Sequence, residues 1–137
     1  MSSQTVFRCF MLLGSVMAGL AVAAGAFGAH MLKGLLDPSM LAVYDTATRY
    51  QLYHAIAIVL TGLAARVCDD PRFAVAGWMF AAGILLFCGS LYVVALLGVR
   101  WMGAITPLGG VALMIGWSLL GWRAWTSSTH STSLPHC

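Results

Sequence analysis

The chain has 137 residues, of which 61% are hydrophobic and only 8% are charged, and its mean hydropathy is +0.89. A soluble domain carries about 25% charged residues, and a chain this short has too little interior to bury so many apolar side chains, so the composition excludes a soluble globular domain and predicts a membrane protein. The net charge of +3 comes from scattered basic residues without a Lys/Arg block, and no nucleic-acid partner is expected.

Four stretches without charged residues follow one another, at residues 9–32, 50–65, 73–99 and 101–122. About 20 helical residues cross the hydrocarbon core of a bilayer. Three stretches are long enough alone, and the second becomes long enough if its helix starts before Arg49. The sequence therefore predicts an all-α, polytopic fold. Residues 1–125 form one four-transmembrane-helix bundle, with helices near residues 5–31, 38–66, 71–98 and 107–125.

The first predicted helix ends in small residues and a histidine, in the stretch GAFGAHMLKGLL at residues 25–36. Small residues let membrane helices approach closely, so Gly25, Gly28 and Ala29 are predicted to form a helix-packing seam. A flat surface for a planar ligand, such as a quinone or haem, is the alternative interpretation. The segment also resembles a signal peptide cleaved near residues 24–26, but its uncharged run is long for one, and we expect the helix to be retained.

The second predicted helix starts at Asp37-Pro38, where the aspartate can cap the free amides of the first turn. Its helical spacing places Tyr50, Gln51 and His54 on one face. His30 closes the first helix on the side of the membrane where the second helix begins. We therefore expect His30 to reach Gln51 or His54 near that interface.

The third and fourth predicted helices carry the same start signal, at Asp70-Pro71 and Thr106-Pro107. They contribute further polar and small residues within the membrane: Ser90, Tyr92, Thr106, Gly89, Gly109 and Gly110. The three glycines are assigned to helix packing on the same reasoning as those of the first helix.

Polar side chains within a membrane span usually face the bundle interior, because hydrocarbon offers them no partner. The sequence predicts one polar cluster from His30, Tyr50, Gln51, His54, Ser90, Tyr92 and Thr106. Either its members hydrogen-bond one another and fix the register between helices, or they bind a small ligand. No catalytic motif and no metal-ligand spacing accompanies them, so neither a catalytic residue nor a metal site is predicted.

Four spans would place both termini on one side of the membrane. Four basic residues lie on that side and three on the other, namely Arg8, Arg66, Arg72 and Arg123 against Lys33, Arg49 and Arg100. This difference favours cytoplasmic termini. Residues 126–137 are rich in Ser and Thr without apolar periodicity, which predicts a flexible tail.

Three stretches together resemble one known family: GAFGAHMLKGLL, TATRYQLYHAIAIVL and GSLYVVALLGVRWMGAITPLGGVALMIGW. Over about residues 8–124 the chain is similar to the small four-helix membrane proteins of domain-of-unknown-function family 423, which includes animal transmembrane protein 256. The resemblance implies this fold and a location in the bacterial inner membrane. It places the following residues in family motifs: Gly25, Gly28, His30, Gln51, His54, Gly89, Ser90, Tyr92, Thr106, Pro107, Gly109 and Gly110. It implies no activity.

Three functions remain open from the sequence. An accessory or structural subunit, packed against itself or within a larger membrane complex, is favoured by the small size, the glycine seams and the missing catalytic motifs. A redox protein that binds haem or quinone through His30 and His54 is one alternative, and a transporter or carrier of a small molecule is the other. No cofactor is predicted outside the redox alternative, and the lipid bilayer is the expected surrounding.

Overall fold

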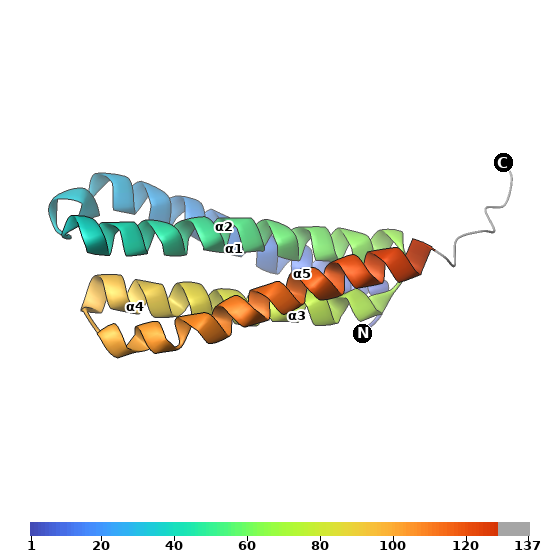
Figure 1. Cartoon of the computed structure of the whole chain (residues 1–137). Coiled ribbons are helices and arrows are strands. Elements are labelled where there is room, and N and C mark those ends of the chain that lie inside the picture. The colour runs from blue at the N-terminus through green and yellow to red at the C-terminus, as the bar shows by residue number, and fades with distance from the viewer. Residues whose placement is uncertain (129–137) are drawn as a thin grey trace, which may run out of the picture.

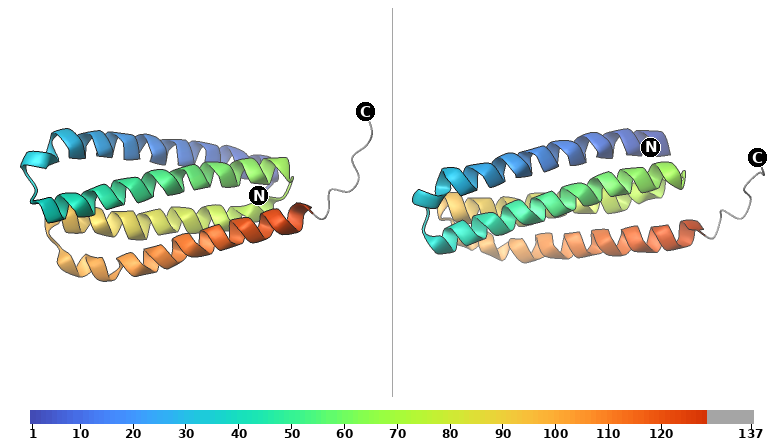
Figure 2. Two further views of the ribbon diagram at one scale, coloured as in Figure 1. Left: turned by 45° about the horizontal axis from the view of Figure 1, so that its top comes forward. Right: turned by 90° about the horizontal axis from the view of Figure 1, so that it is seen from above.

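The computed structural model describes residues 1–128, which form an antiparallel bundle of two helical hairpins (Figures 1 and 2). The first hairpin pairs α1 (Ser3–His30) with α2 (Pro38–Val67). The second pairs a long helical rod with α5 (Thr106–Ser128). The rod consists of α3 (Ala74–Gly83), the π-helical segment η3 (Ile84–Cys88) and α4 (Gly89–Leu97). In Figure 1 the start of α1 and the end of α5 lie at the same end of the bundle.

Short 3₁₀ turns connect these helices: η1 (Leu32–Gly34), η2 (Pro71–Phe73) and η4 (Arg100–Ala104). The predicted cap at Asp37 is present, because its carboxylate accepts hydrogen bonds from the amides of Ser39 and Met40 at 2.9 and 3.1 Å. α1 also has a side-chain cap, which the sequence reading missed: the Ser2 hydroxyl accepts from the Thr5 amide at 3.2 Å. Each cap satisfies a backbone donor that the helix leaves free.

Two helix ends differ from the sequence expectation. The rod stops at Leu97 because Gly98 adopts φ = 69° and donates its amide to the Val94 carbonyl, an αL cap that favours glycine. α5 continues to Ser128, so the predicted tail does not begin at residue 126. The rest of that tail, residues 129–137, lies outside the described residues.

Large aromatic rings fill the interior and rest on glycines. Phe10 and Phe80 are fully buried. The Phe10 ring lies against Gly77 of α3, and a Cβ atom added at Gly116 of α5 would come within 2.7 Å of the Phe80 ring. The aromatic rings of one helix therefore pack against glycines of another. Small residues commonly allow membrane helices to approach closely in this way.

The seam of α1 against α2 follows a seven-residue repeat. Gly14, Ala21 and Gly28 are buried along it. A Cβ atom at Gly14 would lie 2.8 Å from the Ala55 carbonyl, and one at Gly28 would lie 2.7 Å from the Tyr44 ring. Helices that pack at a small angle keep every seventh residue on the contact line, so this repeat defines the seam.

Two of the predicted seam residues, Gly25 and Ala29, are four residues apart, and such a spacing drifts off this line because each step of four residues advances about 40° around the helix. Ala29 is exposed, which corrects its assignment to packing. A Cβ atom at Gly25 would make only an ordinary contact, 3.4 Å from the Thr48 methyl group. Gly89 is also corrected, since a Cβ atom there would meet nothing within 4 Å.

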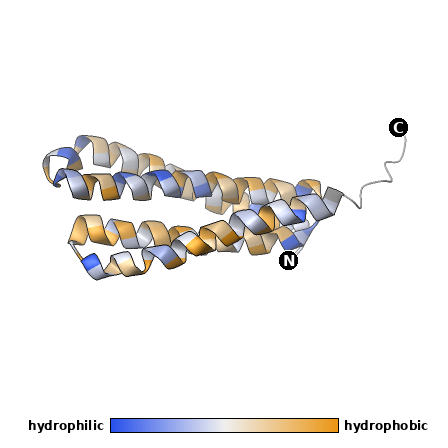
Figure 3. Ribbon diagram, viewed as in Figure 1, coloured by the Kyte–Doolittle hydropathy of each residue, from blue (hydrophilic) through white to orange (hydrophobic). Residues whose placement is uncertain are grey.

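Three helical stretches within residues 1–128 are long and apolar enough to cross a bilayer: Ser3–Gly34, Pro71–Leu97 and Arg100–Ser127. α2 is as long but is not among them. Figure 3 shows more hydrophilic positions along α2 than along the rod formed by α3, η3 and α4. The polar side chains of α2 that are buried, Gln51, His54 and Thr61, are the starting point for the candidate site.

Candidate functional site

Gln51 connects three helices. Its side chain lies in the middle of α2 and is 7% exposed. The Nε2 atom donates a hydrogen bond to the Met17 carbonyl oxygen of α1 at 3.0 Å, and Oε1 accepts one from the Tyr92 hydroxyl of α4 at 3.0 Å. One amide therefore supplies both its donor and its acceptor to neighbouring helices.

Two tyrosines extend this arrangement toward the loop between α1 and α2. The Tyr92 hydroxyl also lies 3.3 Å from the Thr48 hydroxyl. The Tyr44 hydroxyl donates to the Ala24 carbonyl of α1 at 2.9 Å, and the two tyrosine rings meet edge to face, with centroids 5.2 Å apart. We call Tyr44, Thr48, Gln51 and Tyr92 the α2–α4 polar cluster.

His54 lies one turn beyond Gln51 in a pocket of aromatic rings. Its Nδ1 atom is 2.7 Å from the Tyr50 carbonyl oxygen of its own helix. Because a carbonyl only accepts, Nδ1 carries the proton, and Nε2 of the neutral ring is left as an acceptor. The rings of Tyr50, Phe80 and Trp117 surround the imidazole at centroid distances of 5.8, 6.0 and 6.2 Å.

A separate hydroxyl pair joins the rod to α5. The Ser90 hydroxyl donates to the Phe87 carbonyl at 2.9 Å and lies 2.7 Å from the Thr106 hydroxyl. Thr106 was expected to cap the fourth helix, but it is the first residue of α5 and bonds Ser90 instead. The backbone of η3 is close at this level, because Gly109 sits directly against the backbone of Phe87.

Gly110, which was predicted to pack against another helix, also lies beside η3. A Cβ atom added there would make only a loose contact, 3.8 Å from the Phe87 ring. π-helical turns are rare and occur often at functional sites. The sequence ILLFC does not predict a π-helical turn, because its residues are apolar and occur equally in regular membrane-spanning α-helices. This element was therefore not predictable from the pattern of the sequence.

The expected contact of His30 with Gln51 or His54 is wrong. His30 is exposed at the end of α1, whereas Gln51 is bonded at the level of Met17. Met17 lies more than three turns before His30, or about 20 Å along the helix. Both residues are near the α1–α2 loop in the sequence, but Gln51 lies almost four turns inside α2.

Tyr50 is also outside the polar cluster. Its side chain is 41% exposed, and its ring stacks on Phe87 with centroids 4.7 Å apart. Tyr44 and Thr48, by contrast, were missed. Their spacing to Gln51, at i−7 and i−3, places them on the same helix face, so a search for that face in the sequence would have found them.

A shared ligand for the two histidines does not fit this geometry. His54 is a further three residues inside α2 from Gln51, so it is still more distant from His30. Within residues 1–128, no three His, Cys, Asp or Glu side chains come together as a group that could hold a metal ion. What the site does chemically is to saturate hydrogen-bonding groups between helices.

The chain is similar to one family of known proteins. The profile of a family described as "Protein of unknown function (DUF423)" matches residues 24–110, which include the whole α2–α4 polar cluster. A similar protein in Bacillus subtilis (strain 168), named UPF0382 membrane protein YwdK, is 43% identical over 82% of this chain and 93% of its own length.

Relatives in staphylococci are equally similar. A UPF0382 membrane protein of Staphylococcus aureus (strain bovine RF122 / ET3-1) is 42% identical over 82% of this chain and 92% of its own. One from Staphylococcus epidermidis (strain ATCC 35984) is 43% identical over the same shares. No solved structure matches the chain.

Proposed function

Because this chain belongs to the DUF423 family of membrane proteins, we propose that it is a four-span accessory or structural subunit of an oligomeric or larger complex in the bacterial inner membrane. The observation that carries the proposal is the Gln51 amide, whose donor and acceptor are both engaged by neighbouring helices. Such an amide holds helices together, because its nitrogen is bonded to α1 and its oxygen to α4.

α2 is proposed as the fourth span. It lies beside α1 and the rod over its whole length (Figure 2), and its polar residues Gln51, His54 and Thr61 face the interior. A polar residue that bonds inside a bundle is compatible with a membrane span, because hydrocarbon does not contact it. Four spans put both chain termini on one side of the membrane, and the four-to-three distribution of basic residues supports a cytoplasmic side.

The outward face of α5 supports the assembly role. Val111, Met114 and Ile115 are 47%, 63% and 42% exposed, while Gly109 and Leu113 turn inward against the rod. In a membrane these apolar side chains contact either lipid or another protein. We assign this face to protein contact, within a homo-oligomer or a complex with a second membrane protein.

The proposal is tested by extraction of the protein with its surrounding lipid in polymer-bounded particles. We expect a protein mass above the 14.5 kDa of one chain. A photo-crosslinking residue at Met114 should give protein adducts, whereas the matched position Leu20, which is 54% exposed on α1, should give fewer. A single chain in the particles, with no adduct from either position, would refute an assembly role.

A further inference from the structure

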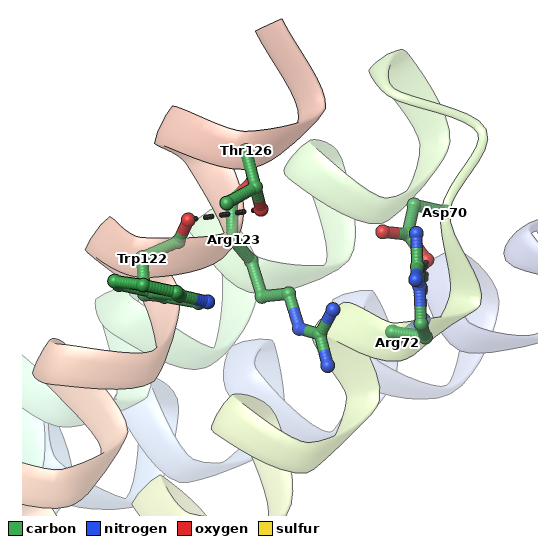
Figure 4. Close-up of polar contacts among 5 residues, drawn as sticks. All are labelled: Asp70, Arg72, Trp122, Arg123 and Thr126. Atoms are coloured by element: carbon green, nitrogen blue, oxygen red, sulfur yellow. Dashed lines mark hydrogen bonds and ion pairs between the residues drawn. The ribbon is translucent and has the colours of Figure 1, made fainter. Parts of the chain in front are cut away.

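A polar pocket lies at the end of the bundle where α1 starts and α5 ends. Its volume is about 640 Å³. The connection between α2 and α3 lines one side with Asp70 and Arg72, and the last turns of α5 line the other with Trp122 and Arg123 (Figure 4). The pocket contains no residue of the α2–α4 polar cluster, and the proposed function does not depend on it.

Asp70 is held firmly by the chain around it. Its Oδ1 atom accepts hydrogen bonds from the backbone amide and the Nε atom of Arg72, both at 2.9 Å. The neighbouring Asp69 adopts φ = 47° and accepts a hydrogen bond from the Ser3 hydroxyl. The αL conformation, which aspartate tolerates better than most residues, directs two consecutive carboxylates to different partners.

Among residues 1–128, the second carboxylate oxygen of Asp70 has no hydrogen-bond partner. The residue is 7% exposed, and Oδ2 is buried without a hydrogen bond among the described residues. A buried carboxylate oxygen without a donor is costly. Within residues 1–128, Arg72 is the one basic side chain within 4 Å of this carboxylate. Asp70 Oδ2 is therefore a hydrogen-bond acceptor in the pocket lining that needs a donor from outside the chain.

The two arginines of the pocket, Arg72 and Arg123, provide hydrogen-bond donors for an anion. Figure 4 shows the Arg123 side chain extending from α5 toward the η2 turn that carries Arg72. The Arg72 side chain is 66% exposed, and only its Nε atom is used by Asp70. Guanidinium groups match the oxygens of a phosphate. The four charged residues lining the pocket, Asp69, Asp70, Arg72 and Arg123, sum to zero formal charge.

The position of the pocket also indicates its surroundings. Trp122, which lines the pocket, and Trp125, one turn further along α5, are 66% and 78% exposed. Tryptophan is enriched where a membrane meets water, because its ring is apolar and its N–H is polar. A pocket at this level lies among the headgroups of the surrounding lipids.

We propose that this pocket binds the phosphoethanolamine headgroup of a membrane lipid. The phosphate accepts hydrogen bonds from Arg123 and from the free nitrogens of Arg72. The primary ammonium donates to Asp70 Oδ2. A headgroup with one negative and one positive charge matches a pocket whose own charges are separated and cancel.

The test uses the full-length protein in detergent, with bound lipid counted by native mass spectrometry. Phosphatidylethanolamine should be retained about tenfold or more over phosphatidylcholine of the same acyl chains, because a quaternary ammonium has no N–H for Asp70. Phosphatidylglycerol, which lacks the ammonium, should also be retained more weakly. Equal retention of the three lipids would overturn the proposal.

Two variants locate the binding. Arg123→Gln removes the phosphate contact, and Asp70→Asn keeps a capping oxygen while it replaces the unpartnered acceptor with a donor. Arg123→Gln should lower the retention of all three lipids, because each of them carries a phosphate, whereas Asp70→Asn should remove the preference for phosphatidylethanolamine. Arg66→Gln is the matched control, because Arg66 is exposed in the last turn of α2, at the same end of the bundle, but does not line the pocket. An equal loss in the control would overturn the assignment to this pocket.

Free phosphoethanolamine separates the lipid from a soluble source. At concentrations equal to the lipid it should not displace phosphatidylethanolamine, since it lacks the acyl chains that hold the headgroup in place. Complete displacement would overturn the lipid assignment. The melting temperature of each variant, compared with the wild type, shows whether it is folded. If Asp70→Asn does not fold, the comparison of the three lipids on the wild type still tests the headgroup, and unchanged retention in Arg123→Gln would overturn the assignment to this pocket.

Discussion

The Gln51 side-chain oxygen of α2 accepts a hydrogen bond from the Tyr92 hydroxyl of α4 at 3.0 Å, and this bond ties the two hairpins of the bundle together. On its other side the same amide holds α1 through the Met17 carbonyl. The contact between hairpins therefore depends on a residue that α1 also helps to position. Removal of either partner should disturb both contacts.

Gln51→Leu should lower the free energy of unfolding in detergent by about 1–3 kcal/mol, because leucine leaves the Tyr92 hydroxyl and the Met17 carbonyl with one partner fewer in the interior. Denaturation followed by circular dichroism measures the change. Ser118→Ala is a suitable control, because the Ser118 hydroxyl is exposed and bonds only the Met114 carbonyl of its own helix. A variant as stable as the wild type would mean that water replaces the amide.

The coupling of the two residues is measured by a double-mutant cycle with Tyr92→Phe. Residues that share a hydrogen bond usually show interaction energies of about 0.5–3 kcal/mol. We expect the double variant to be less destabilised than the sum of the two single variants. Additive effects would show that the contact contributes nothing to stability.

Gly109→Ala should destabilise the contact of α5 with the rod. The added methyl group would press on the backbone of Phe87, which cannot rotate away as a side chain does. Overpacking of this kind costs about 1–3 kcal/mol. Gly121→Ala, in the same helix but with open space around it, is the control, and should be neutral or stabilising because alanine favours the helix. Similar stabilities for the two variants would contradict the close contact.

His30→Gln and His30→Leu should both change the free energy of unfolding by less than about 0.5 kcal/mol. The histidine is exposed at the end of α1, and substitutions at such positions rarely matter for stability. Thermal unfolding of the two variants tests this. A loss with leucine but not with glutamine would point to a buried hydrogen bond of the imidazole and contradict the structure.

The hydrogen bond from Arg72 holds the pKa of the Asp70 carboxyl below its usual range. A lowered pKa stabilises the fold above the pKa of the unfolded chain, about 3.9, and the stabilisation disappears as the pH falls through the folded value. The protection of amides in the α2–α3 connection, measured as the ratio of intrinsic to observed exchange rate, should therefore fall as the pH drops below about 3.9. Asp70→Asn should weaken this dependence. An unchanged pH profile in the variant would assign the effect to another group.

Reporter fusions test the four-span arrangement. A fusion after Arg66, at the end of α2, and one at the C-terminus should report the same side of the membrane, which we expect to be the cytoplasm. The motivation is the antiparallel order of the helices, in which the ends of α2 and α5 lie together (Figure 1). Reports from opposite sides would remove α2 or another helix from the set of spans.

The sequence was sufficient for the membrane class and the all-α fold, because charge-free runs and Asp-Pro helix starts depend on local chemistry. The cap at Asp37 and the αL glycine at the end of the rod belong to the same local category, although only the first was predicted. Depth within the bundle was harder. His30 and Gln51 both follow or precede the α1–α2 loop in the sequence, but they lie at different heights along the bundle. The hydrogen bond of Gln51 to Met17 shows this difference.

The packing seam of α1 was predicted only in part, since Gly28 lies on it and Ala29 does not. An i, i+4 stripe and a seven-residue repeat both fit the small residues of α1, and the choice depends on the angle at which α2 crosses. The structure selects Gly14 and Gly28, because they face Ala55 and Tyr44. The pocket with Asp70 was not predictable either, since Arg123 joins it from a distant part of the chain.

The π-helical turn Ile84–Cys88 sets the angular phase between the two halves of the rod. One extra residue in a helix rotates everything after it by about 100° around the axis, while the rod itself stays continuous. Ser90 and Tyr92 face Thr106 and Gln51 in this phase. A helix of the same sequence without that turn would carry both hydroxyls to another side, so five apolar residues decide which polar groups of the second hairpin meet the first.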